Sequence, residues 1–235
     1  MFDPVTFVSL GPGDPELITL KGLKTLQEAD LIFCPSTALP GGKSSSRAKD
    51  VLLQLSIGES KLNTFNVPMN KDRSLAIESY KAVAEEISDR YKSGHKIAVT
   101  AEGDAGFYST IYYISEYLTQ ENIPVSRIAG VPAFIACGTL ANIHIVKQEE
   151  ELEVIPGIIT SADGLEEKIK TGKTVVLMKA SQCEQVIKEA LENIQDITFH
   201  YFENAGISGK EVYTQNREEI LNRKFPYFSL IIIRK

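Results

Sequence analysis

The sequence is poor in cysteine and histidine, and it contains no tryptophan. Its three cysteines, Cys34, Cys137 and Cys183, form no CxxC pair, and its three histidines are far apart in the chain. Structural zinc sites need paired cysteine and histidine ligands at short spacing. We therefore expect no metal site and no disulfide, as is usual for proteins of a reducing compartment.

Long apolar runs and an excess of basic residues are also missing. No run of about 18 apolar residues occurs, so no membrane span is expected. The first residues, MFDPVTFVSL, lack the basic stretch and long apolar stretch of a secretory signal. The net charge of −6 argues against a general nucleic-acid binder. We expect a cytoplasmic protein that acts on a small molecule, without a nucleic-acid or membrane partner.

What the sequence does contain is a regular alternation of strand-like and helix-like segments, which predicts an α/β fold with mostly parallel, buried strands. The expected strands are VTFVSL, DLIFCP, KLNTFNVP, KIAVTA, PVSRIAG, EELEVIP, KTVVLMKA, DITFHYFENAG, KEVYTQ and YFSLIIIRK. The expected helices cover 16–29, 46–56, 71–92, a stretch ending near 121, 130–142, 163–170 and 181–193. We expect two α/β domains, 1–128 and 129–235.

Bare main chain follows the first expected strand, in the stretch VSLGPGDPEL at 8–17. Glycine lets the main chain approach a ligand, and parallel sheets bind ligands at the carboxyl ends of their strands. A dinucleotide site is disfavoured, because the third glycine of GxGxxG is missing and the second strand ends in Cys34-Pro35 instead of an acid. The P-loop pattern is absent too. Asp14 is expected to cap a helix that begins near Glu16.

Three further turns of this kind follow other expected strands. They are AEGDAGFYST at 101–110, AGVPAF at 129–134 and FENAG at 202–206. Such turns in both halves of the chain predict a ligand between the two domains.

Long stretches of the sequence resemble the tetrapyrrole methylases. VSLGPGDPELITLKGLKTLQEADLI is similar to the opening segment of that family, and EGDAGFYST is similar to its G-D-P loop. GVPAFIACGTLANI, VVLMKA and YFENAG resemble later segments of the family. The resemblance implies two α/β domains with a cleft between them for S-adenosyl-L-methionine, which leaves as S-adenosyl-L-homocysteine. It also implies a homodimer.

The resemblance assigns site residues by position. Those that match cofactor contacts of the family are Pro12, Glu102, Gly103, Asp104, Phe107, Pro132, Ala133, Met178 and Ala205. Three departures from the family pattern are visible. Ala105 replaces the proline of G-D-P, Pro132 replaces a hydroxyl residue, and Ala205 replaces glycine. A side-chain hydroxyl bond to the cofactor from position 132 is therefore excluded.

The chemistry that the resemblance implies is attack of an electron-rich carbon of a macrocycle on a methyl group. Positioning would then supply most of the acceleration. Proton loss afterwards could go to water, Asp104 or Glu102, and Asp104 could instead cap its own loop. Because the substrate carries many carboxylates, Lys43 and Arg47 are candidates to bind it, although solvated surface charges are the alternative. Tyr108 and Tyr112 are candidates to stack on the macrocycle.

The acceptor is indicated by smaller features. FYSTIYYI at 107–114, the serine-rich loop after IFCP, and the closing PYFSLIIIRK resemble precorrin-2 C-20 methyltransferases of cobalamin synthesis. This predicts precorrin-2 or cobalt-factor II as substrate. Three alternatives stay open: a family enzyme with another acceptor, such as a different ring carbon or uroporphyrinogen III; an NAD-dependent oxidoreductase; and a catalytically silent binding module.

Overall fold

The protein is described here by a computed structural model that covers residues 3–38, 44–67, 74–159 and 161–235. The chain divides into two compact units, Met1–Pro132 and Ala133–Lys235, and each is described by itself. The boundary predicted from the sequence, at 128/129, lies shortly before this division. No helix in the described ranges is long and apolar enough to cross a membrane.

The first unit is built on one sheet with the order β3-β2-β5-β1-β6, and β4 also pairs with β2. Its strands are β1 (Val5–Ser9), β2 (Leu31–Ala38), β3 (Ser44–Ser45), β4 (Leu62–Asn66), β5 (Ile97–Ala101) and β6 (Val125–Ile128). The pairs β1–β5, β1–β6, β2–β4 and β2–β5 are parallel, and only the short β3 runs antiparallel to β2 among the described strands. The carboxyl ends of β1, β5 and β6 therefore meet at one edge.

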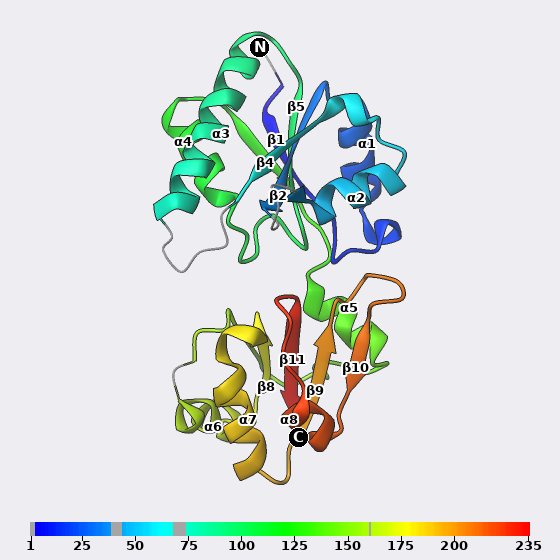
Figure 1. Cartoon of the computed structure of the whole chain (residues 1–235), viewed down its shortest axis with the longest axis vertical. Coiled ribbons are helices and arrows are strands. Elements are labelled where there is room, and N and C mark those ends of the chain that lie inside the picture. Colours follow the sequence, from blue (N-terminus) through cyan, green and yellow to red (C-terminus); the bar gives the residue numbers. More distant parts are fainter. Residues whose placement is uncertain (1–2, 39–43, 68–73, 160) are drawn as a thin grey trace. The chain divides into compact units, whose positions relative to one another are not determined.

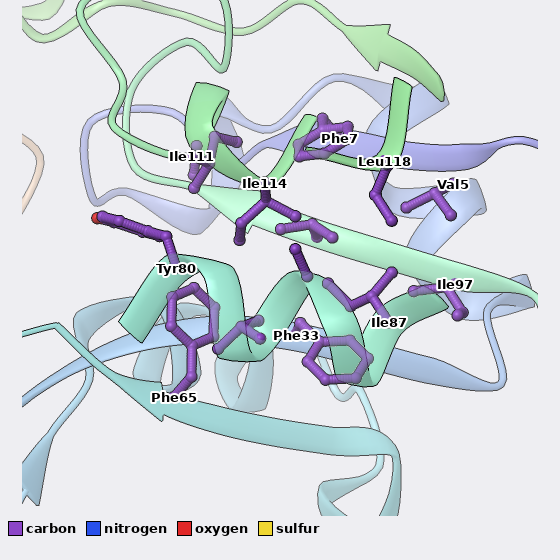
Figure 2. Packing of buried hydrophobic residues seen from close by; sticks show 14 of the residues in the cluster. Val5, Phe7, Phe33, Phe65, Tyr80, Ile87, Ile97, Ile111, Ile114 and Leu118 are labelled. Atoms are coloured by element: carbon purple, nitrogen blue, oxygen red, sulfur yellow. The ribbon is translucent and has the colours of Figure 1, made fainter. Parts of the chain in front are cut away.

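Helices cover both faces of this sheet (Figure 1). They are α1 (Leu20–Glu28), α2 (Arg47–Gln54), α3 (Ser74–Lys92) and α4 (Tyr112–Gln120), with short 3₁₀ turns at Pro15–Leu17 and Glu59–Lys61. Because side chains alternate along a strand, Phe7 packs with α3 and α4 while Val8 packs with α1 and α2. Figure 2 shows the first of these cores, where Ile87, Ile114 and Leu118 lie around Phe7 and its neighbours.

The second unit has a sheet with the order β10-β9-β11-β8-β7. Its strands are β7 (Leu152–Ile155), β8 (Thr174–Met178), β9 (Thr198–Glu203), β10 (Val212–Thr214) and β11 (Ser229–Arg234). Its helices are α5 (Ala133–Leu140), α6 (Ala162–Lys170), α7 (Glu184–Asn193) and α8 (Arg217–Asn222), with a 3₁₀ turn at Ala180–Cys183. Helices α6, α7 and α8 contribute Leu165, Ile187 and Ile220 to the core on one face of the sheet.

The predicted α/β class is confirmed. The first sheet is mostly parallel, whereas most strand pairs of the second sheet are antiparallel. In the second sheet only β7–β8 is parallel, whereas β11 runs antiparallel to both β8 and β9, and β10 antiparallel to β9. A near-continuous apolar strand such as SLIIIR is expected to be buried on both faces. A central strand is buried in this way whether its neighbours run parallel or antiparallel to it, so this pattern does not distinguish the two strand directions. Residues 217–222, which had no predicted structure, form α8, whose first turn is capped by the Asn216 side chain.

Candidate functional site

The turns after β1 and β5 are joined through their glycines. The N–H of Gly11 donates to the carbonyl of Gly103 at 3.1 Å, and the N–H of Gly103 donates to the carbonyl of Gly11 at 2.7 Å. Both residues have positive φ, +78° and +70°, which glycine adopts without the strain of a side chain. The two glycine turns seen in the sequence are therefore one main-chain structure at the strand tips. In the Pro15–Leu17 turn that follows, Glu16 N–H donates to Asp14, so the predicted cap at Asp14 is present.

The buried hydroxyl of Ser9 connects β6 to the turns after β1 and β5. Ser9, at the end of β1, donates to the carbonyl of Ile128 on β6 at 2.6 Å and accepts the N–H of Ala105 at 2.8 Å. Its side chain is fully buried and satisfied by these two bonds. Ser9 thus fixes the loop after β5 relative to β1 and β6.

Asp104 binds main chain on both sides. One carboxylate oxygen accepts the N–H of Gly106 at 2.8 Å, and the other accepts the N–H of Gly130 at 2.7 Å. The first bond caps its own loop, which is the alternative weighed for this residue. The second bond reaches the turn after β6, so Asp104 also holds two of the predicted ligand turns together.

Gly130 sits where a side chain has no room. A Cβ at this position would stand 2.3 Å from the Cβ of Ser9 and 2.9 Å from the carbonyl oxygen of Gly103. In contrast, among the described residues other than its two chain neighbours, no atom lies within 4 Å of the corresponding position at Gly103. The three turns are therefore packed tightly against one another at Gly130, while the Cα of Gly103 is open to a ligand.

Arg47, at the start of α2, meets two other predicted site residues. Its guanidinium donates to the carbonyl of Pro12 at 3.3 Å, and its Nε lies 3.6 Å from the carboxylate of Glu102. Burial raises the pKa of the Glu102 carboxyl, and the charge of Arg47 opposes part of that rise. Burial likewise lowers the pKa of Arg47, against the effect of Glu102. The helix places Arg47 here because Ser46 caps it by accepting the N–H of Lys49.

Aromatic rings follow the β5 turn. The rings of Phe107 and Tyr108 meet edge to face, with 4.6 Å between their centroids. The rings of Tyr112 and Tyr113 are tilted by 32° to each other, with 4.0 Å between their centroids. Tyr113 stacks on Tyr80, which is buried in the core. Tyr108 and Tyr112 expose 44% and 42% of their surface. Tyr113 is therefore packed against the core, whereas Tyr112 is left accessible.

Four predicted cofactor contacts lie at or after the turn that leads into the second unit. Pro132 precedes α5 and Ala133 begins it. Met178 ends β8, and Ala205 follows β9 and is buried. Because Leu230 pairs with both Met178 and Phe202, the ends of β8 and β9 lie at the same edge of this sheet.

A buried polar network stands at that edge. Glu203, the last residue of β9, accepts the Tyr201 hydroxyl at 2.6 Å and the Arg223 guanidinium at 3.2 Å. This network fixes the strand end that leads to Ala205.

The structure therefore brings together Pro12, Glu102, Gly103, Asp104 and Arg47 in the first unit. Lys43 lies outside the described residues. Cofactor and substrate contacts at all these positions stay predictions. Sequence reasoning did not single out Ser9 as a site residue, because a serine inside an apolar strand carries no signal of its own. Among the described residues, no three histidine, cysteine or acidic side chains are grouped to hold a metal ion.

Comparisons with known proteins identify relatives of the chain. A precorrin-2 C(20)-methyltransferase from Sinorhizobium sp is 26% identical over 230 residues, covering 96% of this chain and 93% of the relative. A probable cobalt-precorrin-2 C(20)-methyltransferase from Methanocaldococcus jannaschii is 26% identical over 229 residues, with coverage of 97% and 94%.

The fold is shared with a solved structure, the uroporphyrin-III C-methyl transferase from Thermus thermophilus complexed with S-adenyl homocysteine. The TM-score is 0.64 at 17% identity, and the match covers 99% of this chain and 92% of that one. The sequence model of one protein family, the Tetrapyrrole (Corrin/Porphyrin) Methylases, matches residues 4–221 of the chain. This match confirms the resemblance seen in the sequence. Because it spans most of the chain, the protein belongs to the tetrapyrrole methylases and is a methyltransferase.

Proposed function

We propose that the protein transfers the methyl group of S-adenosyl-L-methionine to C-20, a meso carbon, of precorrin-2 or cobalt-factor II in cobalamin biosynthesis. Two relatives named for C(20) methylation, matching along nearly the whole chain, support this acceptor. The structural observation that carries the proposal is the joined set of glycine turns at the tips of β1, β5 and β6. Homodimerisation stays a prediction from the resemblance.

The residues at these turns fit the proposed methyl donor. When bound, S-adenosyl-L-methionine supplies a methyl group that is activated by a positively charged sulfur. The open Cα of Gly103 admits a ligand to the main chain, and its chain neighbours Glu102 and Asp104 carry carboxylates. Carboxylates and oriented peptide groups suit a cation. We propose as cofactor contacts Pro12, Glu102, Gly103, Asp104, Phe107, Pro132, Ala133, Met178 and Ala205.

Arg47 is proposed to bind a carboxylate of the substrate. Its side chain is 19% exposed and already lies beside Pro12 and Glu102. A guanidinium can bind a carboxylate through two parallel hydrogen bonds. In an acidic protein, such a charge at the site favours binding of an acidic substrate. Tyr108 and Tyr112 are proposed to cover the macrocycle with their accessible rings.

Glu102 is the better of the two carboxylates to take the proton that leaves C-20. Both oxygens of Asp104 are already occupied in accepting main-chain N–H groups, from Gly106 and from Gly130. Burial instead raises the pKa of Glu102, which makes its carboxylate a stronger base. We therefore propose that Asp104 positions the turns and that a Glu102 oxygen accepts the proton.

The acceptor is tested by incubation with methyl-labelled S-adenosyl-L-methionine and, separately, metal-free precorrin-2, cobalt-factor II and uroporphyrinogen III. Label at C-20 of one of the first two is expected, and NMR of the product locates it. Label at another carbon, or on uroporphyrinogen III only, would replace the proposed acceptor. Calorimetry with S-adenosyl-L-homocysteine and with NAD tests the cofactor, and binding of NAD alone would favour an oxidoreductase. Cofactor binding without transfer to any tetrapyrrole would favour a silent module.

Glu102→Gln should lower kcat by about 10²-fold, the lower end of the usual contribution of a general base. The wild-type kcat should fall as the pH drops through the raised pKa of Glu102, because only the ionised carboxylate accepts a proton. The variant should lack that decline.

Glu59→Gln is the matched control, since Glu59 forms an exposed ion pair with Lys49 at 2.6 Å in the same unit. Its kcat should equal that of the wild type. An unchanged kcat and pH profile in Glu102→Gln would remove Glu102 from proton transfer.

A further inference from the structure

The second unit contains a shallow cavity of about 350 Å³, widely open to solvent, that no part of the proposed reaction uses. Its lining includes Thr198 at the start of β9 and Arg234 at the end of β11, which pair with each other in the sheet. Met178 pairs with Leu230 near the start of β11, and Ala205 follows the end of β9. The cavity therefore lies at the opposite end of the second sheet from the predicted cofactor contacts.

The lining is strongly basic for an acidic protein. Lys147, Arg234 and Lys235 bring three cationic side chains to this cavity, and His144 and His200 add two imidazoles. Glu150 pairs with Arg234 at 3.6 Å and accepts the N–H of Lys147 at 2.8 Å. This carboxylate offsets one of the positive charges, so the lining keeps a net positive charge.

Arg234 is held in place within this site. Its guanidinium donates to the carbonyl of His144, in the segment that follows α5, and its side chain is only 15% exposed. A guanidinium has five N–H donors, so these contacts leave others for a ligand. The cation is thus fixed before any ligand arrives, which lowers the entropic cost of binding.

His200 supplies a second fixed group. The residue is 6% exposed, and its Nδ1 lies 3.0 Å from the hydroxyl of Tyr213, whose ring is parallel to the imidazole. Burial raises the pKa of Tyr213, so its hydroxyl keeps its proton and can donate to Nδ1. Nε2 then carries the hydrogen.

The free side of this imidazole faces the cavity. Within the described part of the chain, Nε2 of His200 makes no hydrogen bond. Every buried side-chain nitrogen and oxygen in that part has a hydrogen-bond partner, so Nε2 is not one of the buried atoms. Nε2 is therefore reached by solvent, and the solvent-filled space that His200 lines is this cavity. A nine-tenths buried imidazole that turns a donor toward a basic cavity is a group suited to an anion.

We propose that this cavity binds a small, multiply charged oxyanion, carrying phosphate or several carboxylates, between Arg234, His200 and Lys147. Charge-assisted bonds from a guanidinium and an ammonium, with the Nε2 hydrogen of His200, match the oxygens of such a group. The bound anion would interact directly with His200 and favour its protonated form. It would thereby oppose burial and Arg234, which lower the pKa of His200 in the free protein.

The site is tested by calorimetry on the full chain without methyl donor or tetrapyrrole, so the outcome is independent of the methyl-transfer proposal. Inorganic phosphate, pyrophosphate and citrate are the probes, and their relative affinities distinguish a phosphate from a carboxylate ligand. Binding of at least one probe is expected, and it should weaken about tenfold or more in Arg234→Gln, because hydrogen bonds to charged groups are lost.

Lys147→Gln is the second variant, because Lys147 is exposed and its loss should leave the fold intact. It should weaken binding several-fold. Lys170→Gln is the control, because it removes a charge that is also exposed and is paired with Glu166 on α6; it should not weaken binding. In wild-type protein, the NMR titration of His200 should move to higher pH on adding the probe. No binding of any probe, equal binding in all three variants, or an unmoved His200 titration would overturn the proposal.

Discussion

Gly130→Ala is expected to lower the free energy of unfolding by about 3 kcal/mol, the upper end of the usual cost of overpacking. The added methyl would stand 2.3 Å from the Cβ of Ser9 and 2.9 Å from the carbonyl oxygen of Gly103. Neither neighbour can move alone, because Ser9 is bonded to Ile128 and Ala105, and Gly103 to Gly11. The tips of β1, β5 and β6 would separate. The binding free energy of S-adenosyl-L-homocysteine should therefore weaken by at least as much as the free energy of unfolding.

Denaturant unfolding followed by circular dichroism measures the stability. Calorimetry in the absence of denaturant measures the affinity for S-adenosyl-L-homocysteine. Gly58→Ala is the matched control in the same unit. Gly58 has an ordinary φ of −61°, and the nearest atom to an added Cβ is the Ser60 hydroxyl at 3.8 Å. This substitution should change stability by less than about 0.5 kcal/mol. Wild-type stability and affinity in Gly130→Ala would show that the turns are not packed as described.

Asp104→Asn is expected to weaken binding of S-adenosyl-L-homocysteine about tenfold or more and to cost about 1.5–3 kcal/mol of stability, the range for hydrogen bonds to charged groups. The carboxylate accepts N–H groups from Gly106 and Gly130 with different oxygens. An amide has one oxygen and one NH₂ group, so one of these N–H groups would face another donor. The bond to Gly130 joins the β5 turn directly to the β6 turn.

Asp14→Asn is the matched control, because Asp14 accepts a single N–H, that of Glu16, and asparagine caps equally well. Its stability should stay within a few tenths of a kcal/mol of the wild type. Measuring affinity and kcat together in Asp104→Asn separates two roles for this residue. A lost kcat with unchanged affinity would make Asp104 the proton acceptor in place of Glu102, and unchanged values of both would remove it from the site.

Much of the candidate site could be predicted because its signals are local. Gly11 and Gly103 are recognisable as turn residues after apolar strands, and parallel strands bring their carboxyl ends to one edge. The cap at Asp14 is likewise a matter of two residues in sequence. The pairing of Arg47 with Glu102 was not predicted, because these residues come from the start of α2 and the end of β5 and no short-range pattern connects them.

By itself, the sequence determined the α/β class, the position of most strands and helices, and the family to which the chain belongs, because these depend on hydrophobic periodicity and on contiguous motifs. Only the tertiary structure decided that Ser9 and Asp104 tie three turns together and that Gly130 admits no side chain. It also decided that β11 lies antiparallel between β8 and β9, which brings Arg234 beside the amino end of β9 and creates the basic cavity. These features depend on contacts between residues distant in sequence, and such contacts form only when the strands have been ordered into sheets.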